Sequence, residues 1–227
     1  MTHVIAYSRQ QCKHLVSRLN KRMDADFVGI SSKAGLVAND LKKIGPRIIF
    51  FPHWSNIIPA EIYRDYECII FHMTDLPYGR GGSPLQNLII RGHKKTMISA
   101  LRCVEELDAG PIYMKKPLSL SGSANEIFSR TDALIEDMIV EILETNPEPE
   151  PQNGEPVVFK RRKPEEGDWS EAKTLSEVYD YIRMLDAEGY PPAYIHSGTY
   201  KLEFVKASQN DNAITAEVKI TKAVNNE

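Results

Sequence analysis

The sequence has few cysteines, and no two of them are close together. Cys12, Cys68 and Cys103 form no CxxC pair, and an odd number of thiols cannot pair completely into disulfides. Isolated thiols are typical of reduced cytoplasmic proteins, so we expect a cytoplasmic location. The spacing of a zinc site is also missing, and on this basis we expect no metal.

Long apolar runs are missing as well. The opening stretch THVIAYSRQQC is too short for a signal peptide, and the later apolar runs have the length of strands. Apolar residues nevertheless make up 42% of the 227 residues, enough for a sizeable core. We expect a soluble protein with one large domain, or one domain and a small appendage, and no membrane partner.

The sequence has no basic excess. Its formal net charge is -3, whereas proteins that bind nucleic acid gain most of their affinity by neutralising phosphates. The basic cluster Lys160–Lys163 is followed at once by Glu165 and Glu166. This pattern favours a solvated, locally ion-paired surface over an RNA contact, so nucleic acid is an unlikely partner.

Strand and helix patterns alternate over the first 150 residues. The apolar runs RIIFF (Arg47–Phe51) and ECIIF (Glu67–Phe71) are typical of parallel strands covered on both faces. Further strands are expected at His3–Tyr7, Phe27–Ile30 and Met97–Val104, and helices at Gln11–Met23, Val37–Ile44, Ser83–Ile90 and Ala124–Glu144. The alternation predicts a doubly wound, Rossmann-like α/β fold with a mainly parallel sheet.

A proline-rich segment, Asn146–Pro151, follows the last of these helices and cannot continue it. We therefore predict one domain over residues 1–150 and a small C-terminal domain over 151–227. Within the latter, a helix is expected at Leu175–Leu185. Alternating apolar residues predict two strands, around 200–204 and 214–220, so this part is a small α+β or all-β appendage.

Candidate site residues follow the predicted strands. In doubly wound sheets, ligands bind beyond the carboxyl ends of the strands, and His72 comes directly after ECIIF. Asp108 follows the predicted strand Met97–Val104, so we expect it at the same sheet edge. Taken singly, His72 is either a structural histidine or an acid/base, and Asp108 is either a turn former or a functional carboxylate. Together they suggest an imidazole oriented by a carboxylate.

Two motifs carry a family resemblance. The pattern H-x-T-x-L-P-x-x-R-G-x-x-P, from His72 to Pro84, resembles the signature of the 10-formyltetrahydrofolate-dependent formyltransferases. The segment L-D-A-G-P-I, from Leu107 to Ile112, resembles the second signature of that family, which supplies its aspartate. The segment Lys160–Glu166 and the later Gly189–Ala193 resemble the C-terminal part of the methionyl-tRNA and amino-sugar members.

The resemblance implies roles for particular residues. His72 would act as acid/base and oxyanion partner, and Asp108 would orient it and accept a proton. The formyl donor 10-formyltetrahydrofolate would be held by two loops, at His53, Trp54, Ser55, Glu106, Leu107 and Asp108. The substrate side would be formed by Thr74, Arg80 and Gly81, with Arg80 expected to brace the loop rather than to contact a substrate phosphate.

The sequence departs from the family pattern at one position. The family carries an asparagine two residues before its histidine, where this chain has Ile70. An amide donor aimed at a developing oxyanion lowers the barrier by about 3 kcal/mol. Three alternatives remain open. The donor is replaced by another polar side chain, with Thr74, Asn87 and His93 as candidates. Otherwise catalysis is slow and relies on His72 alone, or the protein binds folate or a sugar nucleotide without turnover.

Size and charge indicate the substrate within the resemblance. The C-terminal part is short and not basic, unlike a module that holds tRNA. The chain is therefore most similar to the compact sugar N-formyltransferases, which implies transfer of a formyl group to a nucleotide-linked amino sugar for cell-surface polysaccharide biosynthesis. The alternatives are a catalytically reduced folate- or sugar-nucleotide-binding homologue and a methionyl-tRNA formyltransferase. Strands of the appendage can pair between subunits, which leaves a homodimer open.

Overall fold

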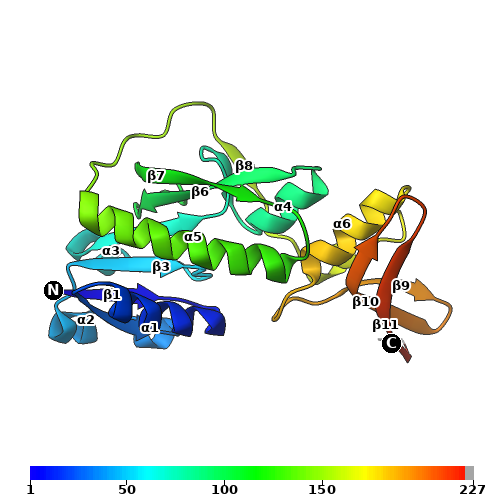
Figure 1. The fold of residues 1–227 in the computed structure, drawn as a ribbon, viewed down its shortest axis with the longest axis horizontal. Helices are drawn as coiled ribbons and strands as arrows, with labels where there is room; N and C mark the ends of the chain where they lie inside the picture. Colours follow the sequence, from blue (N-terminus) through cyan, green and yellow to red (C-terminus); the bar gives the residue numbers. More distant parts are fainter. Residues whose placement is uncertain (223–227) are drawn as a thin grey trace. The chain divides into compact units, whose positions relative to one another are not determined.

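The computed structural model describes residues 1–222, with the backbone alone for Gln11. Figure 1 shows the path of the chain. The strands before residue 160 are β1 (Thr2–Ala6), β2 (Asp26–Ile30), β3 (Ile48–Pro52), β4 (Glu67–His72), β5 (Tyr78–Gly81), β6 (Lys95–Arg102), β7 (Ile112–Ser119) and β8 (Val157–Phe159). The helices there are η1 (Gln10–Cys12), α1 (Lys13–Arg22), η2 (Lys33–Gly35), α2 (Ala38–Ile44), α3 (Ala60–Asp65), α4 (Pro84–Ile90) and α5 (Ala124–Thr145).

The main sheet has six strands in the order β2-β1-β3-β4-β6-β7. The pairs β1–β2, β1–β3 and β3–β4 are parallel, and the pair β4–β6 is antiparallel. The fold is thus Rossmann-like with a mostly parallel sheet, and the fold class predicted from the sequence is confirmed.

Helices cover the central strands, as the continuous apolar runs predict. All five residues of β3 are buried. Leu41 of α2 and Ile62 of α3 belong to an apolar cluster that also contains Val4, Ile49 and Cys68 from the sheet. Ion pairs join α1 to α5, which runs alongside the sheet in Figure 1. A strand without a solvent-exposed face has no alternating polar residues, so the continuous apolar run RIIFF can be recognised in the sequence as a buried strand.

The direction of β6 corrects one expectation. Ile69 of β4 pairs with Arg102 of β6, and His72 pairs with Ser99. The carboxyl end of β6 therefore lies beside the start of β4, at the opposite edge from His72. The assumed parallel direction of this strand was wrong, although Asp108 still lies beside His72, as predicted.

Several short elements have no counterpart among the predicted ones. They are α3, β5, β7, β8 and β9 (Ala193–Ser197). In β7, for example, Leu118 is the one buried residue of eight, and exposure does not alternate regularly along the strand. Since sequence patterns report burial, such strands leave little periodic signal.

The C-terminal part contains η3 (Pro164–Gly167), α6 (Leu175–Leu185), β10 (Tyr200–Gln209) and β11 (Ile214–Lys222) in addition to β9. Its three strands form an antiparallel sheet in the order β11-β10-β9. The predicted helix and both predicted strands are present here, so the expected α+β character is confirmed. Val218 and Ile220 of the edge strand β11 are exposed, and the homodimer stays a prediction.

The chain forms two compact units that interleave in sequence. One comprises residues 1–81, 96–118 and 130–158, and the other comprises 82–95, 119–129 and the residues from 159 onward. This division differs from a single cut near residue 150, because α4 and the start of α5 belong to the second unit. The assignment of functional domains to 1–150 and 151–227 stays a prediction.

A buried histidine in β1 predicts a loss of stability in acid. His3 is 2% exposed and stacks on Phe27 at 5.4 Å between ring centroids. Burial lowers the pKa of His3 to about 4, and the charges of Arg47 and the N-terminus contribute. The folded protein keeps this ring neutral, whereas the unfolded chain protonates it below about pH 6.5. Stability should therefore fall as the pH drops from about 6.5 to 4, by up to about 3 kcal/mol from this group.

Urea unfolding at pH 4.5 and pH 7.5 measures this effect. We expect His3→Phe to reduce the difference in free energy of unfolding between the two pH values. His14→Gln is the matched control, because His14 is exposed on α1. An equal acid loss in wild type and His3→Phe would contradict the assignment.

No helix in the described part of the chain is long and apolar enough to cross a membrane.

Candidate functional site

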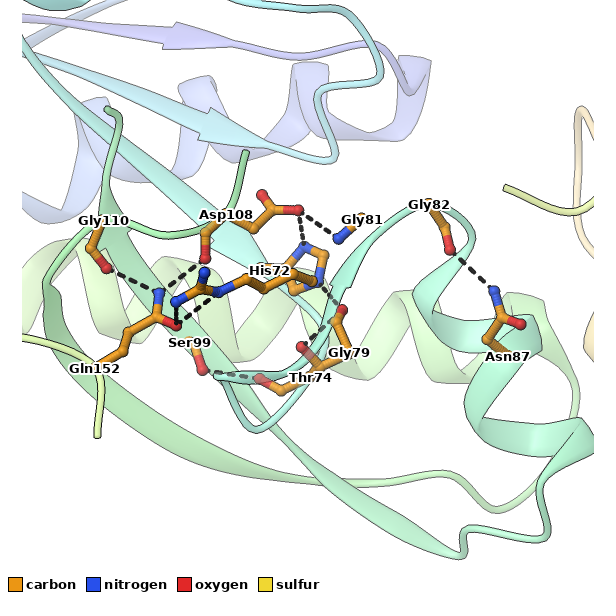
Figure 2. Close-up of polar contacts among 11 residues, drawn as sticks. His72, Thr74, Gly79, Gly81, Gly82, Asn87, Ser99, Asp108, Gly110 and Gln152 are labelled. Atoms are coloured by element: carbon orange, nitrogen blue, oxygen red, sulfur yellow. Dashed lines mark hydrogen bonds and ion pairs between the residues drawn. The ribbon is translucent and has the colours of Figure 1, made fainter. Parts of the chain in front are cut away.

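His72 is the last residue of β4 and is only 7% exposed. Its Nε2 lies 2.8 Å from the carbonyl oxygen of Gly79, in the loop that follows the strand (Figure 2). A carbonyl only accepts, so Nε2 must carry the hydrogen. In the neutral ring the lone pair is then on Nδ1. The loop thus selects the tautomer of His72 and leaves Nδ1 as the atom that can accept a proton.

Asp108 faces that nitrogen. Its Oδ2 lies 3.6 Å from Nδ1 of His72, and both side chains are 8% exposed. The same oxygen accepts a hydrogen bond of 2.9 Å from the backbone N–H of Gly81 (Figure 2). A carboxylate in this place stabilises the ring once Nδ1 is protonated. The structure therefore brings the two predicted catalytic residues together, although β6 ends at the far edge.

A tight turn carries Asp108 to this position. Its backbone adopts a left-handed conformation with φ 53°, which aspartate tolerates better than most residues. The turn closes again at Pro111, whose carbonyl accepts a 2.9 Å hydrogen bond from the N–H of Arg102. The segment 103–110 is thus an excursion that leaves β6 and returns to its end.

Gln152, directly after the proline-rich segment Asn146–Pro151, holds this excursion in place. Its Nε2 donates to the carbonyl oxygens of Asp108 at 2.8 Å and Gly110 at 2.9 Å. Its Oε1 accepts from Nε and Nη2 of Arg80 at 3.1 and 2.9 Å. Arg80 also pairs with Glu106 at 2.9 Å. The predicted bracing role of Arg80 agrees with these contacts, and Figure 2 shows the contacts of Gln152 with Asp108 and Gly110.

Sequence reasoning missed Gln152. A single glutamine among prolines and glutamates predicts a solvent-exposed residue of a linker. The only available signal was its place just after the last helix of the first predicted domain. Its function depends on two carbonyls and a guanidinium that come from distant segments.

Thr74 and Gly81 shape the loop around His72. Thr74 is fully buried, and its hydroxyl donates to the carbonyl of Gly79 at 3.3 Å. The Thr74 carbonyl accepts a 2.8 Å hydrogen bond from Ser99. Gly81 has φ 101°, a conformation that favours glycine. Its backbone N–H donates a hydrogen bond to Oδ2 of Asp108. The observed contacts are internal, and direct substrate contacts of these residues stay predictions.

The second predicted cofactor loop follows β3. Because β3 and β4 are parallel with Pro52 opposite Phe71, His53 leaves the sheet at the same edge as His72.

The contacts within this loop involve Ser55 and Trp54. The N–H and the hydroxyl of Ser55 both lie 3.1 Å from the hydroxyl of Ser8, beyond the end of β1. Trp54 packs edge-on against Phe51 at 5.7 Å between ring centroids, and its buried indole N–H has no hydrogen-bond partner among the residues that the structure describes.

Both loops combine polar groups with an exposed apolar side chain. Ile57 is 72% exposed and Leu107 is 55% exposed. Exposed apolar groups in these loops, together with the unpartnered indole N–H of Trp54 in the first of them, fit a flat, partly polar ligand such as a pterin. The residues present therefore suit a bound folate, although its contacts with His53–Ser55 and 106–108 stay predictions.

The position of Ile70 offers no polar group. Ile70 is partly buried and packs against the apolar cluster on one face of the sheet, as do Trp54 and Cys103.

The replacement donors suggested by the sequence are already engaged. The hydroxyl of Thr74 donates to the carbonyl of Gly79, and the amide of Asn87 donates to the carbonyls of Gly82 and Lys160. Neither side chain presents an unused donor, and His93 is also engaged in interactions of its own.

Comparison with known proteins connects this geometry to one family. A family model described as formyl transferase matches residues 12–140. A second model, described as methionyl-tRNA formyltransferase C-terminal domain, matches residues 164–221. A methionyl-tRNA formyltransferase from Bacillus thuringiensis is 34% identical over 160 residues, which are 66% of this chain and 50% of that protein. The chain spans about half the length of the curated relatives it matches.

Two solved structures extend the comparison. A methionyl-tRNA formyltransferase from Clostridium thermocellum superposes with a TM-score of 0.95 at 46% identity, over 98% of this chain and 100% of that one. A sugar N-formyltransferase from a Shewanella species has a TM-score of 0.66 at 16% identity, over 99% of both chains. At that identity the second likeness shows the fold alone.

Proposed function

Because the chain belongs to the formyl transferase family, we propose that it transfers a formyl group from 10-formyltetrahydrofolate, the formyl donor of that family, to an amine. The observation that carries this proposal is the buried His72–Asp108 pair, with Nδ1 and Oδ2 at 3.6 Å. The acceptor we propose is the amino group of a nucleotide-linked amino sugar, and the site of action is the cytoplasm.

The residues of this chain manage the proton. Bound 10-formyltetrahydrofolate supplies the electrophilic formyl carbon. Nδ1 of His72 takes the proton that the amine loses when its nitrogen bonds to that carbon. Asp108 stabilises the resulting imidazolium, and His72 returns the proton to the leaving nitrogen of the folate when the old C–N bond breaks. Gly79 keeps Nε2 protonated throughout, so the ring cannot adopt the wrong tautomer.

The charge of the C-terminal part supports a small acceptor. Residues 164–222 contain eleven Asp and Glu but only six Lys and Arg. A surface that holds tRNA needs the opposite balance. In the adjoining basic run, Arg162 donates to the carbonyl of Glu166 at 2.6 Å, and its guanidinium lies near the Glu166 carboxylate. This acidic balance is the reason we favour an amino sugar.

The second candidate is formylation of methionyl-tRNA. It is favoured by the family model that matches residues 164–221 and by the relative from C. thermocellum, whose description names that activity. The two acceptors differ in charge by many phosphates, so salt separates them. Transfer to tRNA should weaken steeply between 50 and 200 mM salt, by about a thousandfold in affinity for six or more phosphate contacts, whereas transfer to a nucleotide sugar should not.

An acceptor panel tests the proposal. The full chain is incubated with 10-formyltetrahydrofolate and, separately, with UDP- and dTDP-linked amino sugars or methionyl-tRNA, and release of tetrahydrofolate is followed. We expect a value of kcat/KM for one amino sugar at least about a hundredfold above that for the tRNA. The reverse order would establish the second candidate. Folate binding without turnover of any amine would establish a binding homologue instead.

Gln152 provides a test of the geometry of the site. In Gln152→Glu, the second carboxylate oxygen faces the carbonyls of Asp108 and Gly110 without a hydrogen to donate, while the contact with Arg80 survives. We expect kcat to fall about 10- to 100-fold with a smaller change in KM, because Asp108 moves relative to His72. The pH profile of kcat should shift as well, which a purely structural role would not cause. Asn153→Asp is the matched control, because Asn153 is exposed beside it.

Ile70 provides a test of the missing amide. The side chain at position 70 lies on the same strand face as His72, two residues away in β4. If the oxyanion lacks a donor, Ile70→Asn should raise kcat about tenfold or more, while it destabilises the fold by about 1–3 kcal/mol. Ile70→Val keeps the position apolar and should not raise kcat. Equal rates for the two variants would show that no amide is missing.

A further inference from the structure

Three side chains with metal-binding atoms converge in the described part of the chain, and none of them belongs to the His72–Asp108 pair. They are Cys12 at the start of α1, His53 after β3, and Asp132 in α5. One ligand atom of each lies within 4.8 Å of the other two. Cys12 is 1% exposed, and the side chains of His53 and Asp132 are 7% and 19% exposed. We propose that Cys12, His53 and Asp132 form a binding site for a zinc ion.

The separations can be compared with those of a zinc site, with Sγ of Cys12 within 4.8 Å of the ligand atoms of His53 and Asp132. In a tetrahedral site with the usual bond lengths, two protein donors lie about 3.3–3.7 Å apart. Nε2 of His53 and Oδ1 of Asp132 are 2.8 Å apart as a hydrogen-bonded pair. They need to separate by about half an ångström to bind one ion in place of the shared proton. Such a shift lies within reach of side-chain rotation, and water can complete the fourth position.

The charges balance as well. A thiolate and a carboxylate neutralise a divalent cation, and histidine binds in its neutral form. A thiol gives up its proton when it becomes a zinc ligand. A zinc ion would displace that proton, and binding should release about one proton per site. Cys12 also stands at the N-terminus of α1, where the helix dipole favours a thiolate.

The backbone of His53 is held in an uncommon conformation. Its φ is 48°, in the left-handed region that non-glycine residues rarely adopt. The ring of this residue contacts Asp132, with Nε2 2.8 Å from Oδ1. An ion here would fasten three separate elements together, beside the loop that contains Trp54 and Ser55. We assign the ion a structural role, in which it holds these elements together.

The competing account is a hydrogen-bonded His–Asp pair with a buried thiol that serves only as a small apolar group. The two accounts differ in what Cys12 does. If Cys12 is a ligand, thiolate coordination of the metal disappears when the metal is removed, and metal binding weakens when Cys12 is replaced. An apolar thiol can be replaced by serine without any effect on metal content.

Cobalt and zinc binding to the purified full chain separate the accounts. The protein is stripped with a chelator and titrated with Co²⁺, and thiolate coordination is read from the sulfur-to-cobalt charge-transfer band in the near ultraviolet. Zinc affinity is measured by competition with a chromophoric chelator. We expect one equivalent of either ion in the wild type. Cys12→Ser and Asp132→Asn should bind zinc at least about a hundredfold more weakly and lose the cobalt band.

Cys103→Ser is the matched control, since Cys103 is a partly exposed thiol outside this cluster, and it should keep the band. If Cys12→Ser does not fold, Asp132→Asn alone decides. The proposal is overturned if the wild type shows no thiolate band at one equivalent of Co²⁺. It is also overturned if the band persists in Cys12→Ser or Asp132→Asn. Because no measurement uses turnover, failure here is distinct from failure of the formyl-transfer proposal.

Discussion

Replacement of His72 by alanine should lower kcat for formyl transfer by about a thousandfold. General acid/base catalysis by one positioned histidine contributes about 10²–10⁴ in rate. In this chain the loss should lie well above the lower end of that range, because Ile70 supplies no amide to stabilise the oxyanion once the imidazole is gone. Initial rates at saturating donor and acceptor measure the effect.

KM should change far less than kcat in this variant. The predicted folate loops, 53–55 and 106–108, do not include His72. His14→Ala on α1 serves as the control for histidine loss in general, since His14 is exposed. Circular dichroism and the unfolding midpoint establish that the variant is folded. Undiminished turnover in His72→Ala would remove the histidine from the mechanism altogether.

Replacement of Gly110 by alanine should destabilise the protein by more than about 3 kcal/mol, as overpacking against rigid backbone does. A Cβ at this position would lie 1.8 Å from the carbonyl oxygen of Arg102 and 2.9 Å from its carbonyl carbon. Both atoms belong to the backbone of β6, which is paired with β4, so neither can move cheaply. The excursion that carries Asp108 must shift instead.

The same variant should lose activity beyond its loss of stability. The Gly110 carbonyl is one of the two acceptors of the Gln152 amide, and the shift pulls Asp108 away from His72. Urea unfolding measures the stability and initial rates at low temperature measure the turnover of the folded fraction. Gly45→Ala is the matched control. Gly45 has φ 59° but open space around its Cβ position, so only the backbone term of about 1 kcal/mol remains. Equal losses in the two variants would contradict the close approach.

The C-terminal part shows how far composition alone can lead. Its acidic balance is visible in the sequence, and that balance by itself argues for a small acceptor. The same residues also match a model described by methionyl-tRNA formylation. Charge is additive over residues and survives any fold, whereas the identity of an acceptor depends on shape. This is why the acceptor needs the panel experiment.

The sequence by itself determined the fold class and the histidine of the candidate site. The runs RIIFF and ECIIF are apolar throughout because both faces of the strands are covered, and that burial is local information. His72 follows directly from the end of such a strand. The motif residues around it were also within reach of the sequence, since a tight loop needs its glycines at fixed spacing.

Only the tertiary structure decided how the other groups reach this edge. β6 runs against β4, so Asp108 arrives through a turn held by Gln152 rather than from a parallel strand. The three side chains of the proposed zinc site converge although they are far apart in sequence, with a separation of 41 positions from Cys12 to His53 and of 79 from His53 to Asp132. Strand direction and the meeting of distant side chains depend on how whole elements pack, and no local pattern of hydrophobicity records that outcome.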